Sequence, residues 1–166
     1  MHNVIFIDRD GVINYDPIGD YIKKVEDFKF LDGVLEALRM LSEAGYEIVV
    51  ISNQAGIGDG KYEKKDLDEI TDTMIRSVRA YGAKIDAVYY CLHGKQEGCS
   101  CRKPETGLFE LAAKEFSFDA GRTYFIGDKL SDVEAGRRFG LKTILTLTGH
   151  GKNEQQKINE GNKPDH

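Results

Sequence analysis

The sequence has few cysteines and no long stretch of apolar residues. Only three of its 166 residues are cysteine, and they lie within one short segment, at Cys91, Cys99 and Cys101. Such an odd, clustered set suggests a metal site rather than a disulfide framework. No apolar run approaches the length of a membrane span, and the first three residues lack the basic start of a secretory signal. We therefore expect a cytoplasmic protein with no membrane partner.

An excess of positive charge is also missing. Lys and Arg number 23 against 28 Asp and Glu, which gives a formal net charge of −5. A protein of this charge is not expected to bind nucleic acid or an anionic membrane surface. The hydrophobic content of 40% and the charged content of 31% are those of a globular protein. A single domain of this length buries roughly 70% of its extended-chain surface. Because no long apolar surface helix is evident, we expect a monomer.

Strand and helix patterns alternate along the chain. Short apolar runs predict strands, and apolar residues at helical spacing predict helices. The expected strands are 4–7, 46–51, 85–90, 123–126 and 143–147. The first expected helix begins near Asp32, and three more cover 63–81, 106–116 and 131–139. Asp32 is a good N-cap residue for the first helix. Alternation of this kind is typical of an α/β fold with a mostly parallel sheet and helices on both faces.

Polar side chains directly follow several of these strands. Asp8 and Asp10 follow the first strand, Ser52 and Asn53 follow the second, and Asp128 follows the fourth. Ligands of parallel sheets bind beyond the carboxyl ends of the strands, so these side chains should meet at one edge. Two close carboxylates repel unless a cation or a proton neutralises them, and Mg²⁺ prefers oxygen ligands. The set suits a phosphate and Mg²⁺, although an isolated Asp-x-Asp is more often a turn with solvated acids.

Four short motifs stand in order along the chain. They are Asp8-Arg9-Asp10-Gly11-Val12, Ser52-Asn53, Lys103 and Gly127-Asp128-Lys129-Leu130-Ser131-Asp132. Over about residues 3 to 149 the chain resembles phosphatases of the haloacid dehalogenase superfamily. It is most similar to the subgroup that contains the D-glycero-D-manno-heptose 1,7-bisphosphate phosphatases and the histidinol-phosphate phosphatases. The resemblance implies a Rossmann-like, three-layer phosphatase domain over residues 1–149.

The resemblance also implies a role for individual residues. Asp8 would be the nucleophile that forms an aspartyl-phosphate, and Asp10 would be the general acid and base. Mg²⁺ would be held by Asp8, Asp128 and the backbone carbonyl of Asp10, and it would offset the repulsion between nucleophile and phosphate. Ser52 and Lys103 would bind the transferring phosphate oxygens. The further candidates for substrate contacts are Asn14, Asn53, Gln54, Arg102 and Lys129.

A second constellation lies in the segment after the third expected strand. Cys91-x-His93 is followed, after five residues, by Cys99-x-Cys101. Four soft or borderline ligands suit tetrahedral Zn²⁺, and a Cys₃His set without water would be structural. Both branches of the subgroup share this loop. The alternatives are three free thiols with a surface histidine, an iron–sulfur site, which is less natural with a histidine, and a catalytic Cys–His pair, whose chemistry the acids already supply.

Members of the superfamily usually carry a cap domain either between the first two motifs or before the third. Here the first gap contains only the loop 14–32 and one helix, and the zinc loop occupies the second position, so no large cap domain is expected. The open site that this implies suits a small, extended phosphorylated metabolite. The segment 28–34, the loop 56–60 and the Thr106-Gly107-Leu108 step resemble the heptose bisphosphate branch. These features favour heptose 1,7-bisphosphate, with loss of the 7-phosphate, over histidinol phosphate.

Other functional classes fit less well. A signalling receiver domain also takes phosphate on an aspartate, but its acceptor follows a middle strand and it has no zinc loop. A non-catalytic module that uses zinc to bind a partner fits the sequence less well than the receiver domain does. The glycines of 56–60 lack the spacing of a nucleotide-binding loop, and Tyr62 stands where a Ser or Thr is needed. Asp132 could be an exposed helix acid as readily as a part of the site.

The last residues of the sequence are polar. From 149 to 166, Ile158 is the only large apolar residue, so 150–166 are expected to form a poorly ordered tail. Members of the family usually continue past a Pro-Asp stretch into another strand and helix. Any such element would follow Pro164-Asp165-His166 and would add a strand to one edge of the sheet.

Overall fold

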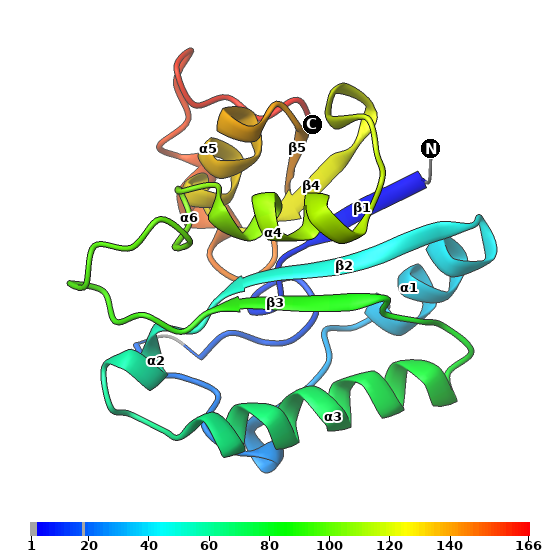
Figure 1. The fold of residues 1–166 in the computed structure, drawn as a ribbon, viewed down its shortest axis with the longest axis vertical. Helices are drawn as coiled ribbons and strands as arrows, with labels where there is room; N and C mark the ends of the chain where they lie inside the picture. The colour runs from blue at the N-terminus through cyan, green and yellow to red at the C-terminus, as the bar shows by residue number, and fades with distance from the viewer. Residues whose placement is uncertain (1–2, 18) are drawn as a thin grey trace.

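A five-stranded sheet forms the middle of the molecule. The computed structural model describes residues 3–17 and 19–166, and the strand order across the sheet is β3-β2-β1-β4-β5 (Figure 1). The strands are β1 (Asn3–Ile7), β2 (Tyr46–Asn53), β3 (Ala87–Cys91), β4 (Tyr124–Gly127) and β5 (Lys142–Leu145). All four strand pairs are parallel, which confirms the predicted sheet. Within the described residues, no helix has the length and apolar character needed to span a membrane.

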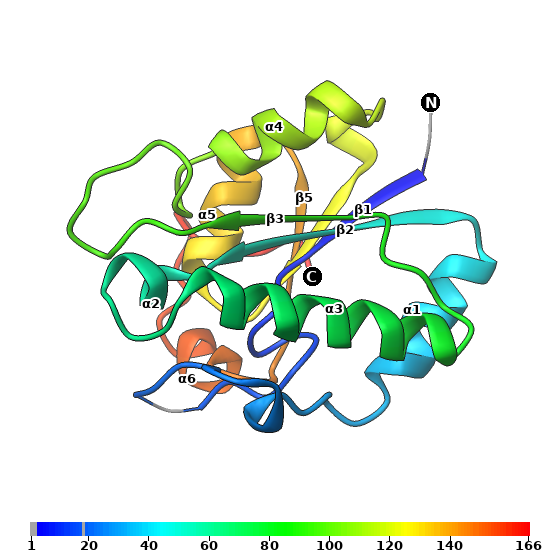
Figure 2. The ribbon, with the colours of Figure 1, turned by 60° about the horizontal axis from the view of Figure 1, so that its bottom comes forward.

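Helices cover both faces of this sheet, so the fold has three layers (Figure 2). On one face lie α1 (Val34–Glu43) and α3 (Lys64–Ala80), and on the other lie α4 (Gly107–Glu115) and α5 (Leu130–Phe139). The shorter helices are η1 (Val25–Asp27), α2 (Ala55–Gly58), η2 (Ala120–Arg122) and α6 (Gly151–Gln155). The predicted three-layer α/β fold is confirmed, and the described residues include no large cap domain.

The pleat of β1 divides the hydrophobic core between the two faces. Successive side chains of a strand point to opposite faces. Val4 and Phe6 therefore pack in the cluster with α4 and α5, whereas Ile5 and Ile7 pack with α1 and α3. Phe109 of α4 makes an edge-on contact with Phe6, at 5.2 Å between ring centroids. Burying one such side chain contributes about 1.5–3 kcal/mol, so both helix layers are held to one short strand.

The strand order changes direction at β1. The chain continues from β1 to β2 and β3 on one side, while β4 and β5 lie on the other side. In open α/β sheets, the crevice at such a reversal, beyond the carboxyl ends of the strands, binds the ligand. Asp8 directly follows β1 and Asp128 directly follows β4. The fold therefore brings these two acids to the two sides of the crevice.

Two local features differ from the sequence expectation. Gly33, with a φ of 76°, is the N-cap of α1, so Asp32 does not cap this helix. Glycine reaches a positive φ without a steric cost, which the preference for Asp at caps does not reveal. The strand β2 extends to Asn53, and α2 then forms where a loop was expected. A helix of only four residues is too short to leave a periodic pattern.

The C-terminal residues lie against the sheet. We expected a poorly ordered tail over 150–166, whereas helix α6 forms there and the last residues return to β5. The backbone N–H groups of Asp165 and His166 donate to the carbonyl of Thr143, and that of Leu145 donates to the carbonyl of His166. The Asp165 carboxylate accepts a bond from the Thr143 backbone at 2.8 Å. Polar composition conceals this segment because backbone hydrogen bonds leave no apolar pattern.

Candidate active site

Asp8 lies at the centre of the crevice and is almost fully buried. Its backbone N–H donates to the carbonyl of Ile126 in β4 at 2.9 Å, which fixes the turn out of β1. Its Oδ1 atom accepts from the backbone of Arg9 at 2.7 Å and lies 3.0 Å from Nζ of Lys103. Burial raises the pKa of Asp8, the Lys103 ammonium opposes this, and the nearby Asp132 adds to it. A buried carboxylate beside one cation is a suitable nucleophile for an electrophilic phosphorus.

Lys103 is the cation that makes this burial possible. Its Nζ lies 3.0 Å from Asp8 and 2.8 Å from Asp132, and it donates to the carbonyl of Ile51 at 2.9 Å. Burial by itself would lower the pKa of Lys103, but the two carboxylates outweigh it, and the pKa lies above its ordinary value. Lys103 is therefore a fixed positive charge at the end of the central strands.

Hydrogen bonds from three neighbouring side chains hold the Asp10 carboxylate in place. Arg9, which is fully buried, donates to both Asp10 oxygens, at 2.8 and 3.0 Å from Nη2. Asn14 donates to Asp10 at 2.9 Å and Gln54 at 2.8 Å. Burial would raise the pKa of Asp10, but the Arg9 charge and these hydrogen bonds hold it below its ordinary value. Asn14 and Gln54, which we predicted to contact substrate, thus face Asp10, and Gln54 also donates to Ser52 Oγ at 3.2 Å.

Asp128 has one oxygen that no hydrogen bond from the described residues satisfies. The side chain is fully buried, Oδ2 accepts from the backbone of His150 at 2.7 Å, and Oδ1 has no partner within 3–17 and 19–166. Burial raises the pKa of Asp128 to about 7, and the negative charge of Asp8 adds to the effect. Asp8, Asp128 and Asp132 each offer an oxygen within 4.8 Å of the others. This unsatisfied, oxygen-only set fits a hard divalent cation such as Mg²⁺.

Asp132 is not an exposed helix acid. Only 1% of its surface is exposed, its Oδ2 accepts from the backbone of Lys129 at 3.0 Å, and its Oδ1 lies 2.8 Å from Lys103. The alternative that placed it on the outer face of its helix is therefore wrong. Asp132 is the N3 residue of α5, so its carboxylate points back towards the loop after β4.

Two residues of the site had no signal in the sequence. Asp16 accepts from Nζ of Lys129 at 3.0 Å and lies 3.0 Å from Nε2 of His150. Both contacts join the loop after β1 to segments more than a hundred positions away in the chain, as the separation of 113 residues between Asp16 and Lys129 shows. Neither Asp16 nor His150 belongs to a short motif, so their proximity appears only in the folded chain.

The acids and cations line one cavity of about 510 Å³. Its walls include Asp8, Asp10, Ser52, Asn53, Arg102, Lys103, Lys129 and Asp132, together with Asp16, Lys95, Tyr21 and His150. Of the predicted site residues, Asn14, Gln54 and Asp128 lie behind this wall rather than on it. Asp10 itself lines the cavity, as Asp8 does. The volume suits a small metabolite.

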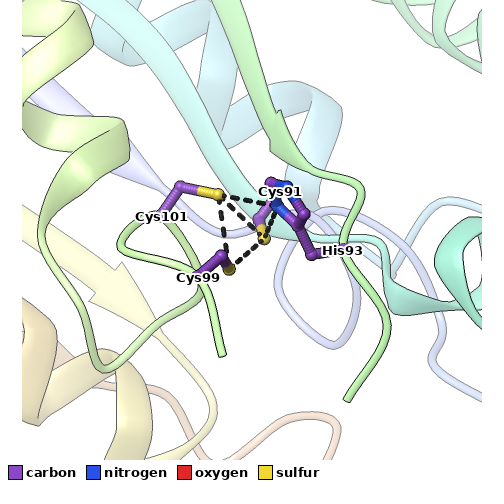
Figure 3. Close-up of side chains that lie close together, drawn as sticks. All are labelled: Cys91, His93, Cys99 and Cys101. Carbon is purple, nitrogen blue, oxygen red and sulfur yellow. Dashed lines mark hydrogen bonds between the residues drawn. The ribbon is translucent and has the colours of Figure 1, made fainter. Parts of the chain in front are cut away.

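Three cysteines and one histidine form a second cluster beside the cavity. Cys101 Sγ lies 3.1 Å from Cys91 Sγ and 3.6 Å from Cys99 Sγ, and His93 Nδ1 lies 3.2 Å from Cys101 Sγ (Figure 3). A tetrahedral zinc with Zn–S bonds of about 2.3 Å would separate its sulfur ligands by ~3.8 Å. The separations here are shorter than that, but all four ligand atoms lie within 4.8 Å of one another, so they converge as a metal site requires. Burial by itself would raise the pKa of Cys99, but hydrogen bonds from backbone N–H groups lower this pKa to about 7. The lower pKa favours the thiolate that zinc requires.

A deep set of carboxylates, one buried lysine and a rim of cations at the carboxyl edge of a parallel sheet defines a phosphoryl-transfer enzyme of the three-layer α/β class. Such cations can neutralise a phosphate, and the Asp8 carboxylate lies on the wall of the same cavity.

The comparisons with known proteins agree with this class. Residues 100–166 match the HAD-hydrolase-like family model. The D-glycero-β-D-manno-heptose-1,7-bisphosphate 7-phosphatase of Haemophilus ducreyi is 39% identical over 153 residues, which cover 87% of this chain and 83% of that protein. The D-glycero-α-D-manno-heptose-1,7-bisphosphate 7-phosphatase of Campylobacter jejuni is 39% identical over 153 residues, which cover 92% of this chain and 84% of that protein.

A solved structure extends the likeness to the fold. The crystal structure of D,D-heptose 1,7-bisphosphate phosphatase from B. bronchiseptica, complexed with magnesium and phosphate, matches with a TM-score of 0.91 at 32% identity, over 97% of this chain and 90% of that one. The chain belongs to the haloacid dehalogenase-like phosphatase family.

Proposed function

We propose that this protein is a Mg²⁺-dependent phosphomonoesterase that removes the 7-phosphate of D-glycero-D-manno-heptose 1,7-bisphosphate. The observation that carries the phosphatase chemistry is the buried Asp8 carboxylate on the cavity wall, 3.0 Å from the Lys103 ammonium. The names of the relatives support the sugar. Relatives at 39% identity carry the α and the β names alike, so the proposal covers both anomers. Such an enzyme serves carbohydrate metabolism.

In the first step, an oxygen of Asp8 bonds to the phosphorus and the bond between phosphorus and the sugar oxygen breaks. Asp10 gives a proton to that leaving oxygen. In the second step, water attacks the aspartyl-phosphate, Asp10 takes the proton of the water, and inorganic phosphate leaves as the Asp8 carboxylate is restored. Arg9 keeps Asp10 ionised before substrate binds. A phosphate that enters beside it adds negative charge and favours protonation of Asp10, with the proton taken from solvent water or from the phosphate monoanion itself, and Asp10 then donates this proton.

Cations and donors on the protein hold the transferring group. Lys103 meets the phosphate oxygens as a fixed charge, and the Ser52 hydroxyl retains its own proton for donation, since it accepts a bond from Gln54. Asp8, Asp128 and the backbone carbonyl of Asp10 would hold Mg²⁺. When bound, this ion supplies the positive charge that lets an anionic carboxylate approach an anionic phosphate. Arg102 and Lys129 would contact the remainder of the substrate.

We propose further that Cys91, His93, Cys99 and Cys101 hold a structural Zn²⁺. With four protein ligands the ion has no open position for water or substrate. Cys101 is joined in sequence to Arg102 and then to Lys103, so a fixed Cys101 fixes two cations of the cavity. The zinc would position these groups and would take no part in the bond changes.

The proposal includes a monomeric protein in the cytoplasm with no nucleic-acid or membrane partner. The net charge of −5 supports the absence of polyanionic partners. Light scattering during size-exclusion chromatography tests the monomer, for which a mass near 18.6 kDa is expected. A mass of twice that value would contradict it.

The substrate is tested by measuring kcat/KM for heptose 1,7-bisphosphate and for histidinol phosphate with the same purified protein. We expect the heptose bisphosphate to be turned over at least tenfold more efficiently, with phosphate lost from C7. The Asp8→Asn variant, prepared in the same way, controls for contaminating phosphatases. A tenfold preference for histidinol phosphate would transfer the assignment to the other branch of the subgroup.

A further inference from the structure

The segment 148–154, which spans the end of the β5–α6 loop and most of α6, contacts the loop that carries Asp128 at two points. The backbone N–H of His150 donates to Asp128 Oδ2 at 2.7 Å. Glu154 of α6 accepts from the backbone N–H of Leu130 at 3.0 Å. Leu130 begins α5 and lies two positions after Asp128, so both ends of this loop are held by the same segment.

The same segment is also tied to the loop after β1. The hydroxyl of Thr148 donates to the carbonyl of Gly11 at 2.6 Å. The approach at this point is very close, because a Cβ on Gly149, whose φ is +50°, would lie 2.2 Å from Asp128 Oδ2 and 2.6 Å from Gly11 Cα. A Cβ on Gly11 would lie 2.1 Å from the same oxygen. Asp128 is thus closely enclosed between two glycine backbones.

These contacts leave one oxygen of Asp128 for a cation. Oδ2 accepts from the His150 backbone, and Oδ1, which is buried and has no hydrogen-bond partner among the described residues, remains available. If segment 148–154 moved away, the carboxylate would lose the donor that fixes its rotation. Partners that orient a metal ligand typically change metal affinity by about 10–100-fold when they are lost.

We propose that Glu154 and Thr148 are positioning residues that hold segment 148–154 against Asp128 and so preorganise this carboxylate for its divalent cation. The inference rests on the proposed function, in which Asp128 is a Mg²⁺ ligand. Neither residue touches the cation or the substrate. Glu154 acts through Leu130 and the loop that follows Asp128, and Thr148 acts through the position of the His150 backbone.

The test is direct Mg²⁺ binding, measured by titration calorimetry on protein freed of Mg²⁺ by dialysis, without substrate. Glu154→Ala and Thr148→Val should each raise the Kd for Mg²⁺ by about 10-fold. Glu154→Gln keeps an oxygen acceptor for the Leu130 N–H and should stay within twofold of wild type. Lys157→Ala is the matched control, because it removes the ion pair on the other oxygen of Glu154 and leaves the Leu130 contact in place.

Asp128→Asn separates this inference from the proposed function. If Asp128→Asn binds Mg²⁺ as well as wild type does, the metal site of the proposed function is wrong. If Asp128→Asn loses binding but Glu154→Ala and Thr148→Val keep wild-type affinity, only the positioning role is overturned. Equal losses in Glu154→Ala, Glu154→Gln and Lys157→Ala would also overturn it, since the effect would then not follow the Leu130 contact. Circular dichroism at the titration temperature shows that each variant is folded, and should Glu154→Ala fail this check, Thr148→Val decides alone.

Discussion

The side-chain amide of Asn53 is bonded to the backbone of Lys103 in both directions. Asn53 Nδ2 donates to the Lys103 carbonyl at 3.2 Å, and the Lys103 N–H donates to Asn53 Oδ1 at 3.0 Å. Fifty residues separate the two in sequence. The end of β2 therefore holds the backbone of the lysine whose ammonium lies between Asp8 and Asp132.

Asn53→Ala should lower kcat/KM by about 10²-fold, because a displacement near 1 Å of a group that meets the phosphate is enough for such a loss. Asn53→Asp keeps the acceptor and loses the donor, so its loss should be intermediate. Initial rates of phosphate release at saturating Mg²⁺ measure both. Turnover by Asn53→Ala within twofold of wild type would show that the Lys103 backbone stays in place without this amide.

Asp8→Asn should abolish turnover and leave the fold intact, since an amide replaces an acid of the same shape at a strand end. Asp10→Asn should reduce the rate by about 10²–10⁴-fold, the range for a lost general acid and base. Phosphate release under Mg²⁺ gives the rates, and near-ultraviolet circular dichroism checks the fold. Near-normal activity in Asp8→Asn would remove this residue from its role as nucleophile.

Cys99→Ser should lower the zinc content of the purified protein and reduce kcat/KM, although no group that meets the phosphate is altered. The reason is that the cluster fixes Cys101, and Cys101 is followed directly by Arg102 and Lys103. The core should survive, because its strands and helices pack without the cluster. Elemental analysis by mass spectrometry measures the metal. Freshly purified wild type without zinc, or zinc-free protein with full activity, would refute the positioning role.

Asp165→Asn tests the contact of the last residues with β5 through its pH dependence. The backbone and side-chain bonds from Thr143 hold the pKa of Asp165 below its ordinary value. A depressed folded-state pKa stabilises the protein above the unfolded pKa, about 3.9, and this contribution disappears as the pH falls through the folded value. The free energy of unfolding of wild type should exceed that of Asp165→Asn by well under about 1 kcal/mol at pH 7, because the carboxylate is exposed and solvent screens its charge.

Urea unfolding between pH 7 and pH 3 measures this difference, with Asp32→Asn as the control at an exposed aspartate. The gap between wild type and Asp165→Asn should be constant near neutrality and should close below about pH 4. A gap that is independent of pH would mean that the Asp165 charge does not contribute, and that any loss comes from shape alone.

The positions of the acids and of the cysteine cluster could be predicted because their signals are local. A strand followed by Asp8 or Asp128 places that acid at the carboxyl edge of a parallel sheet, whatever the rest of the chain does. The spacing of Cys91, His93, Cys99 and Cys101 likewise encodes a ligand set within one loop. Each signal rests on a strand end or a fixed interval between residues.

Partnerships between distant loops could not be predicted in this way. Asp16 meets Lys129 and His150 across loops that have no period of their own, and Asn53 and Gln54 turn to Lys103 and Asp10. Such pairings depend on the course of the backbone between elements. The spacing of apolar residues predicts the helices and strands themselves but not that course. The contacts of Asp165 with β5 escaped for the related reason that they use backbone groups, which every sequence has.

In the five-residue strand β1, the alternation of side chains between the two faces also sets the position of Asp8 at its end. Because side chains alternate between faces, one inserted or deleted residue within β1 would exchange the sides of Phe6 and Ile7 and would rotate Asp8 out of the crevice at the same time. No second substitution nearby could restore both cores. A change of length is therefore not tolerated within this strand, whereas a change in the loops after β1 and β3, away from their residues on the cavity wall, leaves Asp8 in place.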